Sequence, residues 1–345
     1  MALLHILLFP FAVLYNLIMG LRNRMYDQGL RPSIKFDLPV IGIGNLTVGG
    51  TGKTPLTEYL IRLLAKDHKV ATLSRGFGRK TKGFRITQFS DTAATVGDEP
   101  FQFYLKFGDR VKVAVGEERA FAIPNILQHY PETGIILLDD AYQHRSVIPS
   151  LNVLLTDYHR PFYKDFLLPA GRLRESRTGA ERADVVVVTK CPVEMSDEEM
   201  MEIEKSIREY VAKPIFFTHI RYKYPVAFAG HSQRVTDKVA LVSGISNPKP
   251  LEHYIAQNFT LMKHFNFTDH HSYSMADVER LNSFVKENPA VSLLTTEKDK
   301  VKLAASEFEA HTRSLPLFYL PIEVEFIKNG EDFDEIVLNS LKRAG

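Results

Sequence analysis

The stretch GIGNLTVGGTGKTPLTEYLIRLL, residues 42–64, decides the fold class expected for this 345-residue chain. A short apolar strand precedes a glycine-rich turn, and an amphipathic helix begins at Lys53 and Thr54. Strand, turn and helix are the context of the phosphate-binding loop G-x-x-x-x-G-K-[ST], although Thr47 stands where the first glycine of that motif belongs. The stretch therefore predicts a P-loop of variant form.

The glycines of this turn allow backbone N–H groups to close around phosphate oxygens, where side chains would collide. The N-terminus of the following helix adds a partial positive charge. We expect Lys53 to reach the β- and γ-phosphates of a nucleotide and the Thr54 hydroxyl to join the Mg²⁺ shell. A glycine-rich turn without a ligand is the alternative. The predicted nucleotide-binding residues are Thr47, Gly49, Gly50, Thr51, Gly52, Lys53 and Thr54.

Short apolar runs alternate with helical patterns along most of the chain. Most runs are continuous, as expected for parallel strands buried on both faces. Leu56, Leu60 and Leu64 recur at helical spacing, so their helix is expected to pack one face on the sheet. The pattern predicts an α/β fold with crossover helices. The predicted strands are residues 39–44, 69–74, 110–115, 134–139, 151–156, 184–189, 238–243, 260–265 and 291–296.

A polar, turn-prone segment separates two such α/β series and marks a domain boundary. Residues 216–222 and 316–326 are candidate paired strands where the chain leaves and re-enters the first domain. The predicted organisation is an N-terminal membrane-associated helix (1–30), a P-loop-type α/β/α core domain (31–221), a linker (222–237), a second, smaller α/β domain (238–315) and a C-terminal segment that returns to the core (316–345).

The first twenty residues form an almost entirely apolar run. A helix of this length reaches roughly 28 Å, close to the hydrocarbon thickness of a bilayer. A cleaved signal peptide fits poorly, because no basic residue precedes the run and no A-x-A site ends it. Arg22 and Arg24 follow the run and favour a cytoplasmic location for the bulk of the protein. Pro10 interrupts it, so the helix is expected to span the membrane or to lie in its surface, with a buried core helix as the alternative.

The overall charge excludes a broad nucleic-acid surface. The formal net charge is +2, whereas nucleic-acid binders usually concentrate many more Lys and Arg residues on one face. We therefore expect no nucleic-acid partner. Cys191 is the only cysteine of the sequence, which excludes an internal disulfide and any multi-cysteine metal site and fits a reducing compartment.

A P-loop needs a second acid for its metal at the end of another strand, and Asp139 and Asp140 follow an apolar run. Asp139 is the better candidate for direct or water-mediated Mg²⁺ binding, and Asp140 for positioning substrate or metal. An acidic turn after a strand is the alternative. Gln143 and His144 come directly after these acids and are predicted to contact the substrate.

Phosphoryl transfer to a hydroxyl needs a base, which an Asp or an Asp–His pair supplies near neutral pH. GDEP (97–100) places Asp98 and Glu99 in a turn, and FTDHHSY (267–273) places His270 in the second domain. We expect Asp98 and His270 to pair only if the two domains close over the substrate, which would also exclude water. A solvated loop or a metal site is the alternative for the neighbouring histidines.

A cationic patch surrounds the segment GRLRES (171–176). Arg172, Arg174 and Arg177 lie within six residues of one another, which predicts binding of a substrate phosphate, with Arg172 and Arg174 as the contacts. GRKTKGFR (78–85) is a second candidate for that role. A solvated basic face is the alternative.

Several segments match, in order, one known family. They are GNLTVGGTGKTP (44–55), LSRGFGR (73–79), GDEP, LLDDAYQHR (137–145), GRLRES, SGISNP (243–248), FTDHHSY and TTEKDKVKL (295–303). In these segments the chain closely resembles the tetraacyldisaccharide 4'-kinases, the lipid A kinases of Gram-negative bacteria. The likeness includes the threonine in place of the first loop glycine. Ala141-Tyr142 stands where the family often has Gly-Phe, and Arg172 and Ser176 where it often has prolines, which affects local backbone shape rather than the chemistry.

The resemblance implies ATP and Mg²⁺ as cofactors and two α/β/α domains with the active site in the cleft. It implies that an acylated glucosamine disaccharide 1-phosphate at the membrane surface is phosphorylated on its 4'-hydroxyl. The implied location is the cytoplasmic face of the bacterial inner membrane. Carried over by position, Lys53 and Thr54 bind phosphate and metal, Asp139 and Asp140 form the acidic pair, Asp98 and His270 remove the proton, and Glu99 is a further metal contact.

A membrane-tethered P-loop GTPase or metal-insertion chaperone is the second interpretation. VVVVTKCP (185–192) places Thr189 and Lys190 where GTPases carry the start of Asn-Lys-x-Asp, but Pro192 replaces the aspartate that contacts guanine. A strong preference for GTP would favour this interpretation over the kinase. A membrane scaffold with a degenerate nucleotide site is the third, and it makes the acids and the His–Asp pair coincidental.

Overall fold

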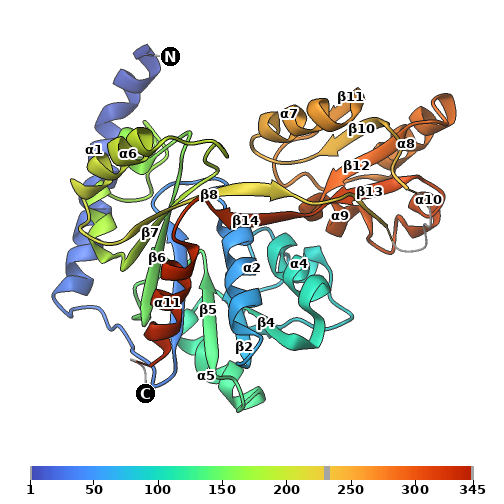
Figure 1. Ribbon diagram of the computed structural model, residues 1–345. Coiled ribbons are helices and arrows are strands. Elements are labelled where there is room, and N and C mark those ends of the chain that lie inside the picture. Colours follow the sequence, from blue (N-terminus) through green and yellow to red (C-terminus); the bar gives the residue numbers. More distant parts are fainter. Residues whose placement is uncertain (1, 229–233, 343–345) are drawn as a thin grey trace.

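The strands of the computed structural model, which describes residues 2–228 and 234–342, form two sheets (Figure 1). The larger sheet has nine strands in the order β14-β8-β7-β6-β1-β5-β2-β4-β3, and the smaller has five in the order β11-β10-β12-β13-β9. All neighbouring strands are parallel except at β14, β3 and β9. The predicted α/β class is therefore confirmed. Residues 229–233 of the predicted linker and residues 343–345 of the C-terminal segment lie outside the described residues.

The larger sheet contains every strand that was predicted before residue 190. Its strands are β1 (Val40–Asn45), β2 (Val70–Ser74), β3 (Arg85–Ile86), β4 (Val111–Val115), β5 (Ile135–Asp139), β6 (Leu151–Asp157), β7 (Val185–Thr189), β8 (Ile215–Tyr222) and β14 (Ile322–Phe326). Its helices are α2 (Lys53–Leu64), α3 (Ala93–Val96), α4 (Asp98–Phe107), α5 (Arg119–His129), α6 (Asp197–Arg208) and α11 (Gly330–Leu341), with short 3₁₀ turns at Gly108–Arg110, Phe162–Lys164 and Arg177–Arg182.

The smaller sheet follows the second predicted series. Its strands are β9 (Val226–Ala227), β10 (Lys238–Ser243), β11 (Thr260–Asn266), β12 (Ser292–Thr296) and β13 (Leu317–Leu320). Its helices are α7 (Lys249–Asn258), α8 (Met275–Glu287), α9 (Glu297–Leu303) and α10 (Glu309–Thr312). Helices α7 and α8 pack against opposite faces of this sheet, which gives it an apolar core of its own.

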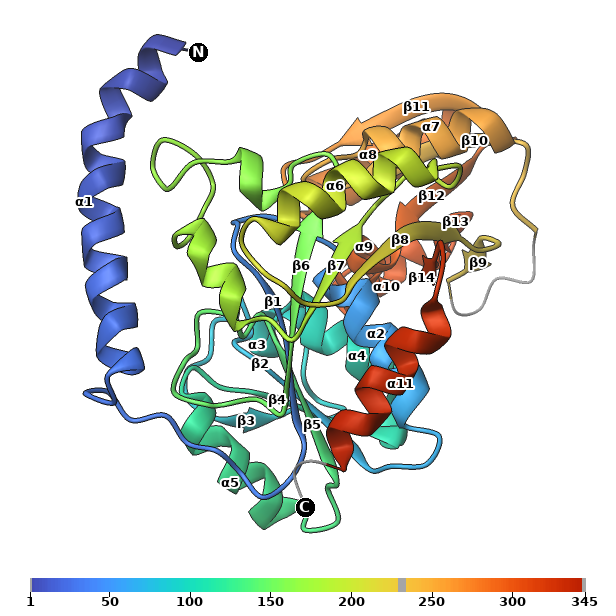
Figure 2. The ribbon, with the colours of Figure 1, turned by 60° about the vertical axis from the view of Figure 1, so that its left-hand side comes forward.

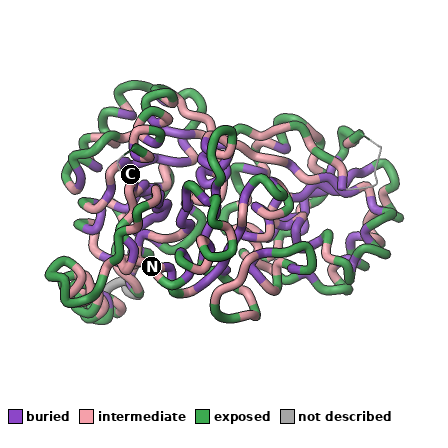
Figure 3. The backbone as a smooth tube through the Cα atoms, turned by 90° about the horizontal axis from the view of Figure 1, so that it is seen from below, coloured by how far each residue is buried: buried purple, intermediate pink, exposed green. Residues whose placement is uncertain are grey.

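Each face of the larger sheet is covered by helices. Helices α2, α4 and α11 pack on one face, and α5 and α6 pack on the other. Viewed from below, the buried residues lie mainly in the interior of the molecule, while exposed residues form most of its outer edge (Figure 3). This arrangement explains why the strands are continuous apolar runs.

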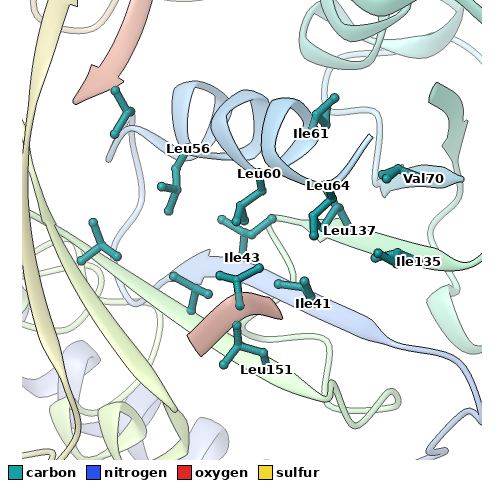
Figure 4. Packing of buried hydrophobic residues seen from close by; sticks show 14 of the residues in the cluster. Ile41, Ile43, Leu56, Leu60, Ile61, Leu64, Val70, Ile135, Leu137 and Leu151 are labelled. Atoms are coloured by element: carbon teal, nitrogen blue, oxygen red, sulfur yellow. The ribbon is translucent and has the colours of Figure 1, made fainter. Parts of the chain in front are cut away.

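Helix α2 is held on the sheet by leucines spaced by one helical turn. Leu56, Leu60 and Leu64 are fully buried and lie against Ile41 and Ile43 of β1 (Figure 4). Burying one such side chain contributes roughly 1.5–3 kcal/mol to folding. The packing fixes the first turn of α2 at the carboxyl end of β1, where the P-loop joins the two elements.

The segment 316–326 was predicted as one strand region paired with residues 216–222, and the structure divides it at Pro321. Strand β14 pairs with β8 in antiparallel register, as predicted. Strand β13 instead pairs with β12 in the smaller sheet, so that half of the prediction is wrong. Proline has no N–H group to donate to a ladder, which explains why the strand breaks there. The linker prediction also missed β9, which pairs with β13.

Helix α1 (Ala2–Asp27) runs along one side of the larger sheet and its helices, with its first turns projecting away from them (Figures 1 and 2). Three polar side chains near its second half contact the core: Tyr15 donates to Arg174 O at 2.8 Å, Arg22 to Gln143 O at 2.7 Å and Asn23 to Glu175 at 2.8 Å. No helix among the described residues combines the length and apolar character needed to cross a membrane.

Candidate active site

The P-loop lies at the carboxyl ends of β1, β5, β6 and β7, where parallel strands leave an edge for a ligand. Gly49 and Gly52 have φ angles of +105° and +83°, in a region that residues other than glycine rarely adopt. Helix α2 begins directly after Gly52, at Lys53. Within the described ranges, no protein acceptor takes the N–H groups of Gly49, Gly50, Thr51 or Gly52. The turn therefore presents free donors at a helix N-terminus, as an anion site requires.

Thr47 occupies the position of the missing glycine without strain. It forms an antiparallel bridge with Leu173, and Val48 N donates to Arg172 O at 2.8 Å. This pairing keeps the entrance of the loop extended, so no glycine is needed there. The Thr47 hydroxyl accepts a hydrogen bond from Asn45 at 3.2 Å. The GRLRES segment thus forms one wall of the P-loop.

Lys53 and Asp140 meet at the centre of the site. Lys53 Nζ lies 3.4 Å from Asp140 Oδ1, and both oxygens of Asp140 accept hydrogen bonds from Arg174 at 2.8 and 3.1 Å. Asn45 accepts from both Lys53 and Arg174. Burial alone would raise the pKa of Asp140, but the two cations outweigh it and hold this pKa well below its usual range. Asp140 is therefore ionised and fixed in position.

Asp139 lies deeper, beside the first turn of α2. Its Oδ1 accepts from Thr57 at 3.4 Å, whereas its buried Oδ2 has no hydrogen-bond partner among the described residues. Burial, followed by the negative charge of Glu99, raises the pKa of Asp139 to about 7. Glu99 in turn accepts from the Thr54 hydroxyl at 2.9 Å. The unsatisfied Asp139 oxygen, the Glu99 carboxylate and the Thr54 hydroxyl are oxygen ligands of the kind that Mg²⁺ takes, since it binds through one or two carboxylates together with phosphate oxygens.

Glycine is required just before the acids Asp98 and Glu99, which occupy the first turn of α4. Gly97 has a φ of +98°, and a Cβ atom there would lie 3.1 Å from the backbone of Gly76. The turn GDEP therefore folds tightly against the LSRGFGR segment. Carboxylates at this position are favoured by the helix dipole.

Asp98 pairs with His270 across the boundary between the two sheets. His270 Nδ1 lies 3.2 Å from Asp98 Oδ2, and Lys302 Nζ lies 3.6 Å from the same oxygen. Burial would raise the pKa of Asp98, but the hydrogen bond from His270 and the charges of Lys302 and Lys298 lower it. The structure thus brings together the two residues that were predicted to meet only on domain closure.

The contacts of His270 define which ring nitrogen carries a proton. Lys298 Nζ lies 3.1 Å from His270 Nε2, and an ammonium group can only donate. Nε2 is therefore the acceptor, and Nδ1–H donates to Asp98. The neighbouring His271 contacts Asp277 at 3.1 Å instead. A metal site was the alternative considered for the two histidines. Across residues 2–228 and 234–342, no group of three or more His, Cys, Asp and Glu side chains is arranged to hold a metal ion.

The two arginines predicted to contact substrate differ in their surroundings. Arg172 is exposed and lies beside Gly49, where its Nη1 atom would be 4.0 Å from an added Cβ. The Arg174 guanidinium is already engaged by Asp140 and Asn45. Only Arg172 therefore presents a free side chain toward an incoming phosphate.

Gln143 and His144 extend from the acidic pair toward α1. Gln143 Nε2 donates to Asn45 O and to Glu175 Oε1, both at 2.9 Å, while its buried Oε1 is unpartnered within the described part of the chain. Burial, followed by the charge of Arg119, lowers the pKa of His144 to about 4. Both side chains are neutral near pH 7, which suits contact with sugar hydroxyls.

Sequence reasoning missed three groups that organise the site. Glu175, 1% exposed, accepts from Asn23 of α1, from Gln143 and from Arg182. Asn45 ends β1 and contacts both Lys53 and Arg174, and only its place between the strand and the loop could have indicated this. The third group is the SGISNP segment, whose Ser246 hydroxyl would lie 3.3 Å from a Cβ added to Gly50. The smaller sheet thus reaches the P-loop directly.

Comparison with known proteins agrees with this geometry. The family model described as "Tetraacyldisaccharide-1-P 4'-kinase" matches residues 4–342. The chain belongs to the tetraacyldisaccharide 4'-kinase family. The tetraacyldisaccharide 4'-kinase of Flavobacterium johnsoniae is 44% identical over 99% of this chain and 98% of its own length. That of Phocaeicola vulgatus is 40% identical over 94% and 92% of the two chains.

A solved structure shares the fold as well. The crystal structure described as an "apo" form of LpxK from Aquifex aeolicus in complex with ATP has a TM-score of 0.76 and 29% sequence identity to this chain. It covers 98% of this chain, and this chain covers 99% of it. Membership of the tetraacyldisaccharide 4'-kinase family confirms the resemblance found in the sequence segments. It favours a kinase over the GTPase, the metal-insertion chaperone and the scaffold.

Proposed function

We propose that this chain is an ATP-dependent lipid kinase that transfers the γ-phosphoryl group to the 4'-hydroxyl of an acylated glucosamine disaccharide 1-phosphate in lipid A biosynthesis. One observation carries the proposal. Adjacent residues of α4 contact the two halves of the site: Glu99 accepts from Thr54 of the P-loop, and Asp98 accepts from His270 of the smaller sheet. The phosphate-binding loop and a base for the acceptor hydroxyl are thereby joined through one helix turn.

The P-loop residues bind and orient the triphosphate. The N–H groups from Gly49 to Gly52 and the Lys53 ammonium neutralise phosphate charge, and Asp140 with Arg174 fixes the position of Lys53. Thr54, Asp139 and Glu99 would hold Mg²⁺. When bound, the cation would supply positive charge against the negative charge that develops on the transferred phosphoryl group.

Asp98 accepts the proton of the 4'-hydroxyl as that oxygen bonds to the γ-phosphorus and the bond from this phosphorus to the β,γ-bridging oxygen breaks, so that ADP leaves. His270 donates to Asp98 through Nδ1 and keeps the carboxylate in one orientation. Because Lys298 and Lys302 also lower the pKa of Asp98, the carboxylate is ionised before the hydroxyl arrives. The smaller sheet covers this side of the site and limits the access of water, which would otherwise compete with the acceptor.

Arg172, Gln143 and His144 form the acceptor side in this proposal. Arg172 lies beside the P-loop with no side-chain hydrogen bond or ion pair to the described residues, and it binds the phosphate of the substrate. The unpartnered Gln143 Oε1 accepts from a sugar hydroxyl. Arg174, which was also expected to bind substrate, holds Asp140 in this proposal.

Helix α1 binds the membrane surface in this proposal. Its exposed apolar side chains lie around the helix, while Tyr15, Arg22 and Asn23 attach it to the active-site segments. Such a helix brings the site to a lipid whose acyl chains stay in the bilayer. The use of ATP and the basic residues after the helix support a location on the cytoplasmic face of the inner membrane. The exposed apolar residues are Leu7, Phe9, Phe11, Val13, Leu14, Leu17, Ile18 and Leu21.

A phosphorylation assay tests the activity. Purified protein in detergent is incubated with acylated disaccharide 1-phosphate and either ATP or GTP, and the position of the new phosphate is mapped by ³¹P–¹H correlation. We expect ATP-dependent product with phosphate on the 4'-oxygen, and no product from Lys53→Ala. A preference for GTP, or transfer to another hydroxyl, would contradict the proposed function.

A flotation assay tests the membrane role separately. Leu14→Glu and Leu17→Glu place charges on the exposed face of α1. Leu338→Glu, at an exposed position of α11, is the matched control. With vesicles of phosphatidylethanolamine and phosphatidylglycerol, we expect the α1 variants to lose binding and the control to keep it. Unchanged flotation of the α1 variants would exclude this helix as the membrane contact.

A further inference from the structure

Two side chains at the end of β7 contact consecutive carbonyl groups of the P-loop. Thr189 Oγ1 donates to Thr51 O at 2.8 Å, and Lys190 Nζ donates to Gly50 O. Lys190 Nζ also contacts Asp157 Oδ2 at 2.7 Å, at the end of β6. Thr189 and Lys190 belong to the segment TKCP (189–192). Neither phosphate binding nor proton transfer, as proposed above, uses this segment.

The contacts control where the P-loop N–H groups point. In a trans peptide the C=O of one residue and the N–H of the next are directed to opposite sides of the peptide plane. Because Lys190 holds the carbonyl of Gly50, the N–H of Thr51 points away from β7. Because Thr189 holds the carbonyl of Thr51, the N–H of Gly52 points the same way. Both donors are thereby directed away from β7, and within the described part of the chain neither of them has a protein acceptor.

Lys190 is held firmly in this position. Its φ is +60°, a left-handed conformation that is unfavourable for a residue with a Cβ atom. Asp157 fixes the ammonium group, and Thr189 also contacts Thr156 O at 3.3 Å. A Cβ atom at Gly52 would lie 3.4 Å from Thr189, so this end of β7 packs closely against the loop. Strain that the surroundings maintain is typical of functional sites.

We propose that Lys190 and Thr189 are positioning residues that preorganise the P-loop for the triphosphate, with Asp157 as the anchor of Lys190. Neither side chain contacts the nucleotide; each acts through a P-loop carbonyl. The inference rests on the proposed function, in which the loop binds ATP. It also gives the Thr189-Lys190 pair a role in phosphate binding rather than in the recognition of a base.

Binding of ATP and turnover, measured together on the full chain in detergent, test this role. The variants are Lys190→Met and Thr189→Val, which remove the donors at similar size, with Lys190→Arg as the rescue and Lys213→Met on the exposed surface as the control. We expect the Kd and KM for ATP to rise about tenfold in Lys190→Met and Thr189→Val. A donor that holds phosphate equally before and during transfer changes KM rather than kcat, so kcat should stay within about threefold. Lys190→Arg should restore the wild-type KM.

Three results would overturn the positioning role. The first is wild-type ATP affinity in both variants. The second is a fall in kcat without a change in the KM for ATP. The third is an equal rise in the KM for the lipid acceptor together with a lowered unfolding midpoint, which indicates general loss of structure. Failure of the proposed function is distinguishable, because the wild-type protein itself would then neither bind ATP nor phosphorylate the acceptor.

Discussion

The Nδ1 atom of His270 lies 3.2 Å from Oδ2 of Asp98, although 172 positions separate the two residues along the chain. Asp98 lies in a helix that packs on the larger sheet, and His270 in a loop that follows a strand of the smaller sheet. The contact exists only because α9 and the loop before α8 bring the smaller sheet against α4. Lys302 of α9 also contacts Asp98, and Lys298 contacts His270. Formation of the Asp98–His270 pair is therefore inseparable from the docking of the two sheets.

Replacing Asp98 by Ala should lower kcat by about a thousandfold, because a positioned base contributes roughly 10²–10⁴-fold. His270→Ala should cost about a hundredfold, since Asp98 remains but is no longer oriented. ATP affinity should stay unchanged in both. Asp67→Asn is the control, because Asp67 is exposed beyond the end of α2 and makes no side-chain contact with Asp98 or His270 among the described residues. Near-normal turnover in Asp98→Ala would show that another group accepts the proton.

Gly44→Ala should reduce both stability and activity. A Cβ atom at this position would lie 2.7 Å from the backbone nitrogen and Cβ of Tyr142, which is buried and hydrogen-bonded to Gly179 O. Forcing these atoms apart costs roughly 1–3 kcal/mol and displaces the segment after Asp140. Urea unfolding measures the loss. Gly134→Ala, whose nearest neighbour would be 3.8 Å away, should be close to wild type. Equal stability of the two variants would argue against a close approach at Gly44.

Lys106→Met should destabilise the docking of the two sheets. Lys106 Nζ lies 2.6 Å from Glu58 of α2 and 2.6 Å from Glu297 of α9, and the Glu58 side chain is 2% exposed. Burial already raises the pKa of Glu58, so the loss of the Lys106 charge should lower the free energy of unfolding by about 2 kcal/mol. This is less than the full penalty of breaking a buried ion pair, because Arg62 and Gln102 still donate to Glu58. Urea unfolding of Lys106→Met and of exposed Lys66→Met compares the two sites. A difference below about 0.5 kcal/mol would contradict the prediction.

His144 should make the protein less stable in mild acid. Its pKa is about 4 in the folded state against about 6.5 in the unfolded state, so the unfolded chain binds more protons between these values. Stability should therefore fall as the pH falls through this window, by about 2 kcal/mol between pH 7 and pH 5. His144→Gln should remove that part of the pH dependence in urea titrations, whereas His68→Gln on the exposed surface should retain it. An unchanged slope in His144→Gln would show that the imidazole is not buried in its neutral form.

Local patterns were sufficient to predict the strands, the P-loop and the two acids at the end of β5, because each depends on residues close together in the chain. The Asp98–His270 pair was predicted as well, but only through its chemistry and the family resemblance. Periodicity gives no information on which sheet a strand joins, and for this reason the division at Pro321 was not foreseen.

The other differences between the sequence-based expectations and the structure arise from contacts between residues that are far apart in the chain. Arg174 lies in a cationic stretch and was predicted to bind substrate, yet the strand pairing of its segment with the P-loop directs it to Asp140. Glu175 is one charged residue among many in the sequence, and its importance comes from burial between α1 and the site. Neither effect leaves a trace in spacing or composition.

The chain crosses between the two sheets twice, and the crossings are adjacent: Lys223 N donates to Pro321 O at 2.9 Å. Residues 223–321 therefore form a module inserted into a fold whose own strands, β8 and β14, close on each other at the insertion point. Such an insert can diverge in length or loops without altering the register of the host sheet. Evolution could thus vary the part that carries His270 while the ATP-binding half kept its architecture.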